Sequence, residues 1–331
     1  MIKTAGWIRG EWTRRHLIWP LEAALFITLL ALLATLPRRT ADKVGGHITA
    51  FFGARFSRQH ARAMRRNIAV AFPQLTQSES LALQKRIWRH LGRILSTYSH
   101  LPPLLRRPDL GGAVTVEGMD HLKAAAERGR YLLVGAHFGH WEMAGCYAAM
   151  LGHKMTALYT PESNPLIDRL IQHLRQTASA ESRLIPRGPN AVRRMMETLR
   201  EGGGLFIIVD QRVDDGEWLP FFGVPARTTT TPARLARRFD CPIVPASAVL
   251  LANGRYRITY HEPLHPDPSR DADDDVQEIT LALNRMFESW IRQEPGQWLC
   301  LKRRWPKDKE RTAAPPVGVV EAEPRIAAPV D

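Results

Sequence analysis

The chain has 331 residues, 44% of them hydrophobic, a content that is ordinary for a globular protein and excludes a largely disordered chain. Its three cysteines, Cys146, Cys241 and Cys300, are too few and too scattered for a disulfide scaffold, and no Cys-x-x-Cys pair indicates a structural zinc site. A formal net charge of +13 points to anionic partners, such as nucleic acid, phospholipid headgroups or phosphorylated substrates.

The first element expected along the chain is a long apolar helix at residues 17–36, which carries one charge, Glu22. A membrane-spanning helix needs about 20 mostly apolar residues, so this stretch is just long enough. Trp12 and Trp19 occupy the positions of interfacial aromatics, and arginines on both flanks leave the orientation open. We therefore expect residues 1–40 to form a single N-terminal membrane anchor. The alternatives are an in-plane or protein-packed helix and a cleaved signal peptide.

Residues 41–110 are expected to form a basic helical region next to the membrane. Apolar side chains recur there at helical spacing beside arginines at positions 55, 58, 62, 65 and 66. One helix should end at Phe72-Pro73, and the next should open at Ser78 and Glu79. The arginines have two interpretations, which are a helix face in water and a surface that lies on anionic membrane lipids.

The pattern changes in residues 111–306, where short apolar runs alternate with helical stretches. This alternation predicts an α/β fold with a mostly parallel sheet flanked by helices, and with active groups at the carboxyl ends of its strands. Strands are expected at 114–116, 131–135, 155–159, 205–209, 243–250 and 256–260, and helices at 141–151, 165–179, 191–200 and 232–238. The Ala-, Pro- and Val-rich residues 307–331 are interpreted as a disordered tail.

The first candidate site follows the expected strand at 131–135. His137 comes directly after this strand, and Glu142 falls in the first turn of the next helix. A carboxylate there can accept a hydrogen bond from one imidazole nitrogen and leave the other nitrogen as a base. A hydroxyl held against that base becomes a nucleophile, which suits acyl transfer without a protein nucleophile. The alternatives are a loop histidine that only caps the helix, and His140 as the base.

A second candidate site follows the expected strand at 205–209, which delivers Asp210 and Gln211 at its carboxyl end. Asp210 is suited to orienting either a base or a substrate hydroxyl. The aromatic residues at 218–222 are interpreted either as a loop that receives an acyl chain or as core. The threonines at 228–231 precede Pro232, and we favour a helix cap over a phosphate site for them.

A third candidate site combines the segment YTPESNPLID, which contains Tyr159 and Asn164, with Arg187. Both follow apolar runs and should lie at the same sheet edge as His137, where Arg187 has the geometry to pair with a phosphate. A surface arginine beside a turn is the alternative. The sequence lacks a Walker loop, a dinucleotide fingerprint, a Gly-x-Ser-x-Gly elbow and a His-Glu-x-x-His helix, which argues against the corresponding enzyme classes.

Several ordered segments resemble the late lipid A acyltransferases, the lauroyl/myristoyl branch of the lysophospholipid acyltransferase superfamily. They are RRNIAVAFPQL (65–75), AHFGHWEMAG (136–145), YTPESNPLIDRLI (159–171), IPRGPNAVRRM (185–195), VDQRVDDGEWLPFFGVPARTTTTPARLAR (209–237) and EPGQWLCLKRRWP (294–306). The resemblance extends over most of the chain outside the tail. The sequence departs from the branch at Thr160, His140 and Lys302, where Arg, Asn and His are frequent, and this affects the choice of acceptor more than the chemistry.

The resemblance implies a glycerolipid-acyltransferase-like fold and an enzyme that needs no cofactor and no metal. It implies His137 as general base with Glu142 as its orienting partner. Substrate-binding positions are then Arg187, Asp210, Gln211, Tyr159 and Asn164. The developing oxyanion would be stabilised by backbone amides around Gly139 or by Arg187.

The resemblance also implies the partners and the location. Acyl carrier protein would donate a fatty acyl group to a hydroxyl of an acylated, phosphorylated glucosamine lipid, a lipid A precursor. The protein would sit on the cytoplasmic face of the inner membrane and contact anionic membrane lipids. The alternatives are transfer to a lysophospholipid or another glycolipid, and a non-catalytic, membrane-tethered basic protein. We expect no nucleic-acid partner, because no recognition helix or aromatic-rich basic motif is present.

Overall fold

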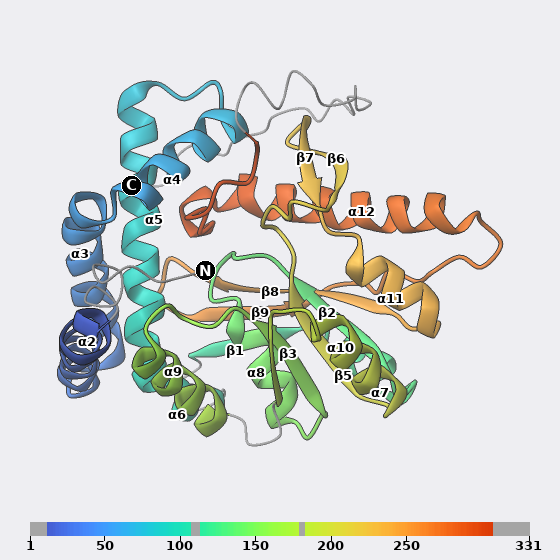
Figure 1. Ribbon diagram of the computed structural model, residues 1–331, viewed down its shortest axis with the longest axis horizontal. Coiled ribbons are helices and arrows are strands. Elements are labelled where there is room, and N and C mark those ends of the chain that lie inside the picture. Colours follow the sequence, from blue (N-terminus) through green and yellow to red (C-terminus); the bar gives the residue numbers. More distant parts are fainter. Residues whose placement is uncertain (1–11, 107–112, 179–182, 307–331) are drawn as a thin grey trace.

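The structure, a computed structural model, describes residues 12–106, 113–178 and 183–306. The expected tail at 307–331 lies outside these residues. The described chain consists of a helical N-terminal region followed by an α/β region (Figure 1).

The centre of the α/β region is a seven-stranded sheet with the order β1-β9-β8-β2-β5-β3-β4. All neighbouring strands pair in parallel except β8 and β9, which are antiparallel. This confirms the predicted mostly parallel sheet. The strands are β1 (Val114–Glu117), β2 (Tyr131–Gly135), β3 (Met155–Tyr159), β4 (Arg183–Pro186), β5 (Gly204–Ile208), β8 (Ile243–Leu250) and β9 (Tyr256–Tyr260).

Helices cover both faces of this sheet, as the fully buried side chains of β2 require. Helix α8 packs on β3, β8 and β9, whereas α10 and α11 pack on the other face and α12 lies against α11. The helices of this region are α7 (Met119–Glu127), α8 (Glu142–Met150), α9 (Pro165–Ala178), α10 (Ala191–Arg200), α11 (Thr231–Phe239) and α12 (Ala272–Gln293).

A two-stranded antiparallel hairpin, β6 (Glu217–Phe221) and β7 (Val224–Thr228), stands beside α12. The loop expected from the aromatic residues at 218–222 is wrong, because most of them form the first strand of this hairpin. Pro220, Gly223 and Pro225 hide the strand pattern, because proline and glycine are unusual inside strands.

The N-terminal region is helical, as predicted. It contains the short π-helix η1 (Arg14–Ile18), then α2 (Trp19–Ala34), α3 (Arg38–Phe56), α4 (Arg58–Ala71) and α5 (Gln77–Thr97). Helix α5 opens with a capping box between Thr76 and Glu79, two residues before the expected start at Ser78. Helix α3 lies very close to α5, since a Cβ added at Gly92 would be 2.2 Å from the carbonyl oxygen of Gly45. Two short helices, η2 (Tyr98–His100) and α6 (Leu101–Arg106), lead towards the sheet.

Candidate active site

The pairing of β2 with β5 brings His137 and Asp210 together. These strands are parallel neighbours in which Gly135 faces Ile208. His137 lies two residues beyond the end of β2, and Asp210 lies two residues beyond the end of β5. The two side chains therefore meet at the carboxyl edge of the sheet although 73 residues separate them in the chain.

Asp210 binds the His137 ring through Nδ1, with a distance of 2.6 Å to Oδ1. The same carboxylate oxygen accepts the backbone N–H of His137 at 3.0 Å. Burial alone would raise the pKa of Asp210, but the charge of His137 and the hydrogen bonds from His137 and Trp298 hold it below its ordinary value. Asp210 is thus an ionised acceptor at neutral pH, which places the imidazole proton on Nδ1.

Gln211 lies on the opposite side of the same ring, with its Nε2 atom 3.2 Å from His137 Nε2. An amide NH₂ group can only donate, so His137 Nε2 accepts at this position. Asp210 and Gln211 thus specify the same tautomer. The His137 side chain is 24% exposed, whereas that of Asp210 is 3% exposed. The arrangement leaves Nε2 as the basic atom on the accessible side of the pair.

The C-terminal segment after α12 holds this pair in place. Trp298 donates its indole N–H to Asp210 Oδ2 at 3.1 Å, so both carboxylate oxygens have partners. The backbone N–H of Leu299 bonds the His137 carbonyl at 2.8 Å, and the Gln297 carbonyl accepts from Gly139 at 3.0 Å. No sequence motif marks Trp298 as a functional residue, and the one signal for this part of the chain is the matching EPGQWLCLKRRWP segment.

Backbone amides of the His137 loop are already used. Three of these amides donate to backbone carbonyls: Phe138 to Ala136, Gly139 to Gln297, and His140 to Ala248. The amide of His137 donates to the Asp210 carboxylate. Gly139 has φ +58°, and a Cβ at this position would lie 2.0 Å from the Ala248 carbonyl oxygen. The expectation that amides around Gly139 stabilise an oxyanion is therefore not met in this structure.

Glu142 does not take the role expected for it. It is the first residue of α8, is buried, and binds Arg175 of α9 through two hydrogen bonds, one of them 2.9 Å long between Arg175 Nε and Glu142 Oε2. Burial would raise the pKa of Glu142, but the Arg175 guanidinium holds it below its ordinary value. The orienting carboxylate on His137 is Asp210. Glu142 instead joins α8 to α9.

His140 is fully buried, and neither of its ring nitrogens has a hydrogen-bond partner among the described residues. Burial lowers its pKa to about 4, so the ring is neutral at physiological pH. It packs between the rings of Tyr98 and Tyr256. A ring with this environment cannot reach a substrate, which favours His137 over the alternative base.

Tyr159 and Arg187 lie side by side at the same sheet edge, as predicted. Tyr159 ends β3, and its carbonyl accepts the backbone N–H of Arg187 at 2.8 Å just beyond β4. The Tyr159 hydroxyl accepts from Gln172 at 2.8 Å. Arg187 is exposed and makes no ion pair with another described side chain. Its guanidinium is available to an anion.

Asn164 is placed differently from the expected substrate-binding position. Its side chain is buried and contacts α2, where Nδ2 donates to the Trp19 carbonyl at 2.9 Å and to Glu22 at 3.1 Å. Its Oδ1 accepts the backbone N–H of Leu166 at the start of α9. The residue therefore links the N-terminal apolar helix to the α/β region.

The aromatic segment at 218–222 is mostly core. Phe221 is fully buried, and Phe222 stacks on Trp298 with a centroid distance of 6.2 Å. Trp305 packs against Phe221 and Trp298. The structure therefore favours core packing over an acyl-chain loop for these aromatic residues, which pack around Trp298, the residue that bonds Asp210.

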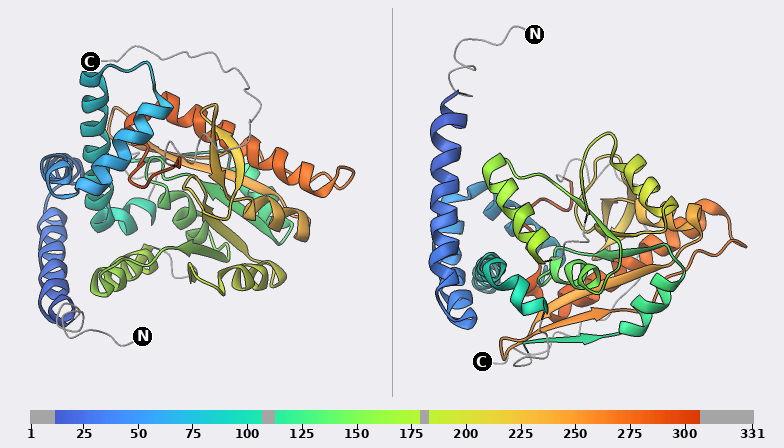
Figure 2. Two further views of the ribbon diagram at one scale, coloured as in Figure 1. Left: turned by 45° about the horizontal axis from the view of Figure 1, so that its top comes forward. Right: turned by 90° about the horizontal axis from the view of Figure 1, so that it is seen from below.

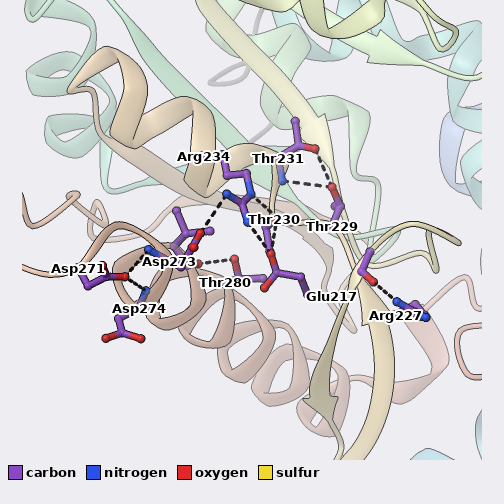
Figure 3. Close-up of polar contacts among 12 residues, drawn as sticks. Glu217, Arg227, Thr229, Thr230, Thr231, Arg234, Asp271, Asp273, Asp274 and Thr280 are labelled. Carbon is purple, nitrogen blue, oxygen red and sulfur yellow. Dashed lines mark hydrogen bonds and ion pairs between the residues drawn. The ribbon is translucent and has the colours of Figure 1, made fainter. Parts of the chain in front are cut away.

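Of the threonines at 228–231, Thr228 ends β7, whereas Thr229, Thr230 and Thr231 lie at the start of α11 (Figure 3). Thr229 accepts the backbone N–H of Thr231 at 3.3 Å, and Arg234 of α11 pairs with Glu217 at 2.8 Å. Arg304 bonds the hydroxyl of Thr228 at 2.7 Å. The N-cap residue Thr230 makes no side-chain capping hydrogen bond, because its hydroxyl donates to Glu217 at 3.3 Å, so the favoured cap interpretation is wrong for this residue.

No group of three or more His, Cys, Asp or Glu side chains within the described ranges is placed to hold a metal ion. The expectation of a reaction without a metal or cofactor stays a prediction.

A family model and several known proteins match this chain. The model of the bacterial lipid A biosynthesis acyltransferase family matches residues 9–307. A lipid A biosynthesis acyltransferase from Haemophilus influenzae is 23% identical over 88% of this chain and 90% of its own length. A lipid A biosynthesis lauroyltransferase from Escherichia coli is 27% identical over 85% of this chain and 90% of its own.

One more known protein and one solved structure also match the chain. A phosphatidylinositol mannoside acyltransferase from Mycobacterium tuberculosis is 28% identical over 77% of this chain and 81% of its own length. The crystal structure of a 1-acyl-sn-glycerophosphate acyltransferase from Thermotoga maritima matches with a TM-score of 0.36 and 15% identity, over 76% of this chain and 98% of that one.

Proposed function

Because the chain belongs to the bacterial lipid A biosynthesis acyltransferase family, we propose that it transfers a fatty acyl group from acyl carrier protein to a hydroxyl of a lipid A precursor. The observation that carries this proposal is the His137–Asp210 pair, which holds an imidazole Nε2 as a base at the carboxyl edge of the sheet. Ligands of open α/β sheets bind at this edge.

His137 acts as the general base in this reaction. The acceptor hydroxyl displaces Gln211 from Nε2, gives its proton to that nitrogen, and its oxygen attacks the thioester carbonyl of the donor. The tetrahedral intermediate then collapses, the carbon–sulfur bond breaks, and the carrier thiolate leaves with the proton held by His137. Asp210 stabilises the imidazolium that forms in between. General-base help of this kind is worth about 10²–10⁴-fold in rate.

Arg187 and Gln211 are the side chains we assign to substrate. Arg187 is an exposed cation at the active edge and suits a lipid phosphate. Since the amides of the His137 loop are occupied, the Gln211 amide is the donor beside Nε2 that we assign to the developing oxyanion.

The net charge of +13 suits both an acidic carrier protein and an anionic lipid. We place the enzyme on the cytoplasmic face of the inner membrane, held there by its N-terminal apolar helix. One helix in the described chain, Arg14–Ala34, is long and apolar enough to cross a membrane.

A second acceptor class is favoured by one specific observation, the 28% identity to a phosphatidylinositol mannoside acyltransferase. A mannosylated phospholipid also presents sugar hydroxyls and a phosphate. The same His137 chemistry serves either acceptor, so the alternative concerns only the lipid that is bound.

The experiment that tests this proposal offers the purified protein one acyl-carrier-protein donor with a lipid A precursor, a phosphatidylinositol mannoside and a lysophospholipid in parallel. Products are identified by mass spectrometry. We expect a gain of one acyl chain on the lipid A precursor. Acylation of only one of the other lipids contradicts the assigned acceptor, and no transfer from the carrier protein to any lipid contradicts the assigned reaction.

A further inference from the structure

Arg304 is a buried cation in the segment after α12, and it is only 1% exposed. Its backbone N–H donates to Asn67 Oδ1 of α4 at 2.9 Å. Its guanidinium donates to two groups of β7, the Arg227 carbonyl and the Thr228 hydroxyl, each at 2.7 Å. The segment therefore lies between α4 and the β6–β7 hairpin (Figure 2). The acyl-transfer steps assigned to His137, Asp210 and Gln211 leave this cation without a role.

No carboxylate lies beside the charge of Arg304. Within residues 12–106, 113–178 and 183–306, no Asp or Glu oxygen forms an ion pair with this guanidinium. Its two acceptors are neutral, and its Nε atom has no hydrogen-bond partner among the described residues. Burying a charge costs free energy unless an opposite charge compensates it. The position of Arg304 therefore requires an anion at somewhat longer range.

Two aromatic rings connect Arg304 to the candidate active site. The guanidinium lies over the ring of Phe221, with its Cζ atom 4.7 Å from the ring centroid. Phe221 packs edge-on against Trp298 at a centroid distance of 6.2 Å, and Trp298 donates its indole N–H to Asp210 at 3.1 Å. Phe221, Trp298 and Asp210 are all buried. Little water therefore screens the attraction between the Arg304 and Asp210 charges.

Two buried acids act on this cation, Asp210 and Glu288. Burial lowers the pKa of Arg304 to about 10, and the charges of these two acids oppose that fall, so the guanidinium stays protonated at neutral pH. Glu288 already has a cation of its own, because Arg292 pairs with it at 2.9 Å. Its charge is therefore largely balanced within α12.

Asp210 has no permanent cation beside it. Its partners are the ring and the backbone N–H of His137 and the indole N–H of Trp298. The His137 ring is neutral whenever it is ready to accept a proton, so the balance of the carboxylate charge must then come from another group. Arg304 is a buried cation on the Trp298 side of this carboxylate, and it has no closer anion to satisfy.

We propose that Arg304 is a positioning residue for the base, whose buried charge acts across Phe221 and Trp298 to balance Asp210 and to disfavour the protonated form of His137. This role rests on the proposed function and deepens it, because it keeps Nε2 of the same base free to accept a proton. Without this cation, the imidazolium loses a repulsive neighbour and forms more readily. For charges roughly 10–15 Å apart at an effective dielectric constant of about 20, the effect is about one pH unit.

The test follows the protonation of the His137 ring directly and needs no substrate. The full chain with isotope-labelled histidine is titrated by NMR in detergent micelles, and the His137 signal is identified by its loss in His137→Ala. We expect Arg304→Met to raise the midpoint of the His137 titration by about one pH unit. Arg304→Lys, which keeps the charge, should restore most of the wild-type midpoint. An unchanged midpoint in Arg304→Met, or an equal shift in Arg304→Lys, overturns the proposal.

Arg227→Met is the matched control. Arg227 also lies over an aromatic ring, that of Trp218 at 4.5 Å, and also donates to a backbone carbonyl, that of Gly216 at 2.8 Å. It lies on the opposite face of β7 from the buried Thr228 and is partly exposed, so solvent screens its charge. The control should keep the wild-type midpoint. A shift as large as that of Arg304→Met would assign the effect to the loss of any stacked arginine, and would overturn the proposal.

A double-mutant cycle covers the case in which Arg304→Met is too unstable to titrate. Asp210→Asn leaves Arg304 without its balancing charge, so adding Arg304→Met to that variant should cost less free energy of unfolding than adding it to the wild type. Equal costs in the two backgrounds, or a double variant that fails to fold where Asp210→Asn folds, overturn the proposal. Neither measurement uses an acyl donor or acceptor, so failure here and failure of the proposed function are distinguishable.

Discussion

Trp298→Phe removes one hydrogen-bond donor from the candidate active site and keeps an aromatic ring in its place. The indole N–H of Trp298 is the donor to Asp210 Oδ2, at 3.1 Å, and its ring is held by Phe222 and Phe221. Asp210 is 4% exposed, so water cannot readily replace the lost donor. A hydrogen bond to a charged group contributes about 1.5–3 kcal/mol. If all of it supports the transition state, kcat falls by about 10- to 150-fold.

The same change should alter the pH profile. The hydrogen bond from Trp298 is one of the causes that hold the pKa of Asp210 below its ordinary value, so its loss should raise the pKa of Asp210. The acid limb of kcat/KM should therefore move to higher pH. The assay is acyl transfer from carrier protein across pH, with product lipid measured by mass spectrometry.

Trp305→Phe is the matched control. Trp305 belongs to the same aromatic cluster and also loses an indole hydrogen bond, but its acceptor is the neutral carbonyl of Val224 at 3.3 Å. It should keep kcat and the acid limb of the wild type. If Trp298→Phe leaves both unchanged, or if the two variants lose activity equally, the positioning role assigned to Trp298 is refuted.

Three further outcomes follow from the site. Arg187→Ala should raise the KM for the acceptor by about 10- to 150-fold and leave the KM for the donor unchanged. Adding Thr160→Arg to this variant should lower the acceptor KM part of the way back. A rise in the donor KM alone would contradict the role of Arg187. Arg175→Met should lower the free energy of unfolding by about 3–5 kcal/mol because it leaves Glu142 buried and unpaired, and adding Glu142→Gln should restore part of it in chemical denaturation. Because burial lowers the pKa of His140 to about 4, the unfolded chain takes up its proton first, and the free energy of unfolding should fall by up to about 1.4 kcal/mol per pH unit between about pH 6.5 and 4. His140→Phe should remove this contribution to the loss of stability in acid. If the free energy of unfolding of the variant falls with pH as steeply as that of the wild type, His140 is not the cause.

The fold was predictable from the sequence because its signal is local. Short apolar runs such as Tyr131–Gly135, each followed by a helical stretch, predict parallel strands with crossovers. The same reasoning placed His137, Tyr159 and Arg187 at one edge, since carboxyl ends of parallel strands meet there. The β6–β7 hairpin escaped prediction because its prolines and glycine resemble a loop.

The partner of His137 was not predictable in the same way. Glu142 is five residues from His137 in the chain, so local spacing favours it as the partner carboxylate. Asp210 lies next to His137 only because β5 pairs with β2 and lies between β2 and β3. Sequence order does not reveal that strand order. The sequence allows Asp210 two roles, which are to orient a base or to orient a substrate hydroxyl. The β2–β5 register favours the first role, because it places Asp210 beside His137. Trp298 depends on the path of the C-terminal segment, for which no periodic pattern exists.

The central claim is that His137 is the base and Asp210 its orienting carboxylate. Single-turnover transfer by purified His137→Ala and Asp210→Asn, each with an unfolding temperature measured alongside, tests it most directly. We expect transfer to fall by about 10²–10⁴-fold in both variants while the protein stays folded, because neither side chain is part of the apolar core. Wild-type turnover in His137→Ala, or full activity in Asp210→Asn, would contradict the account.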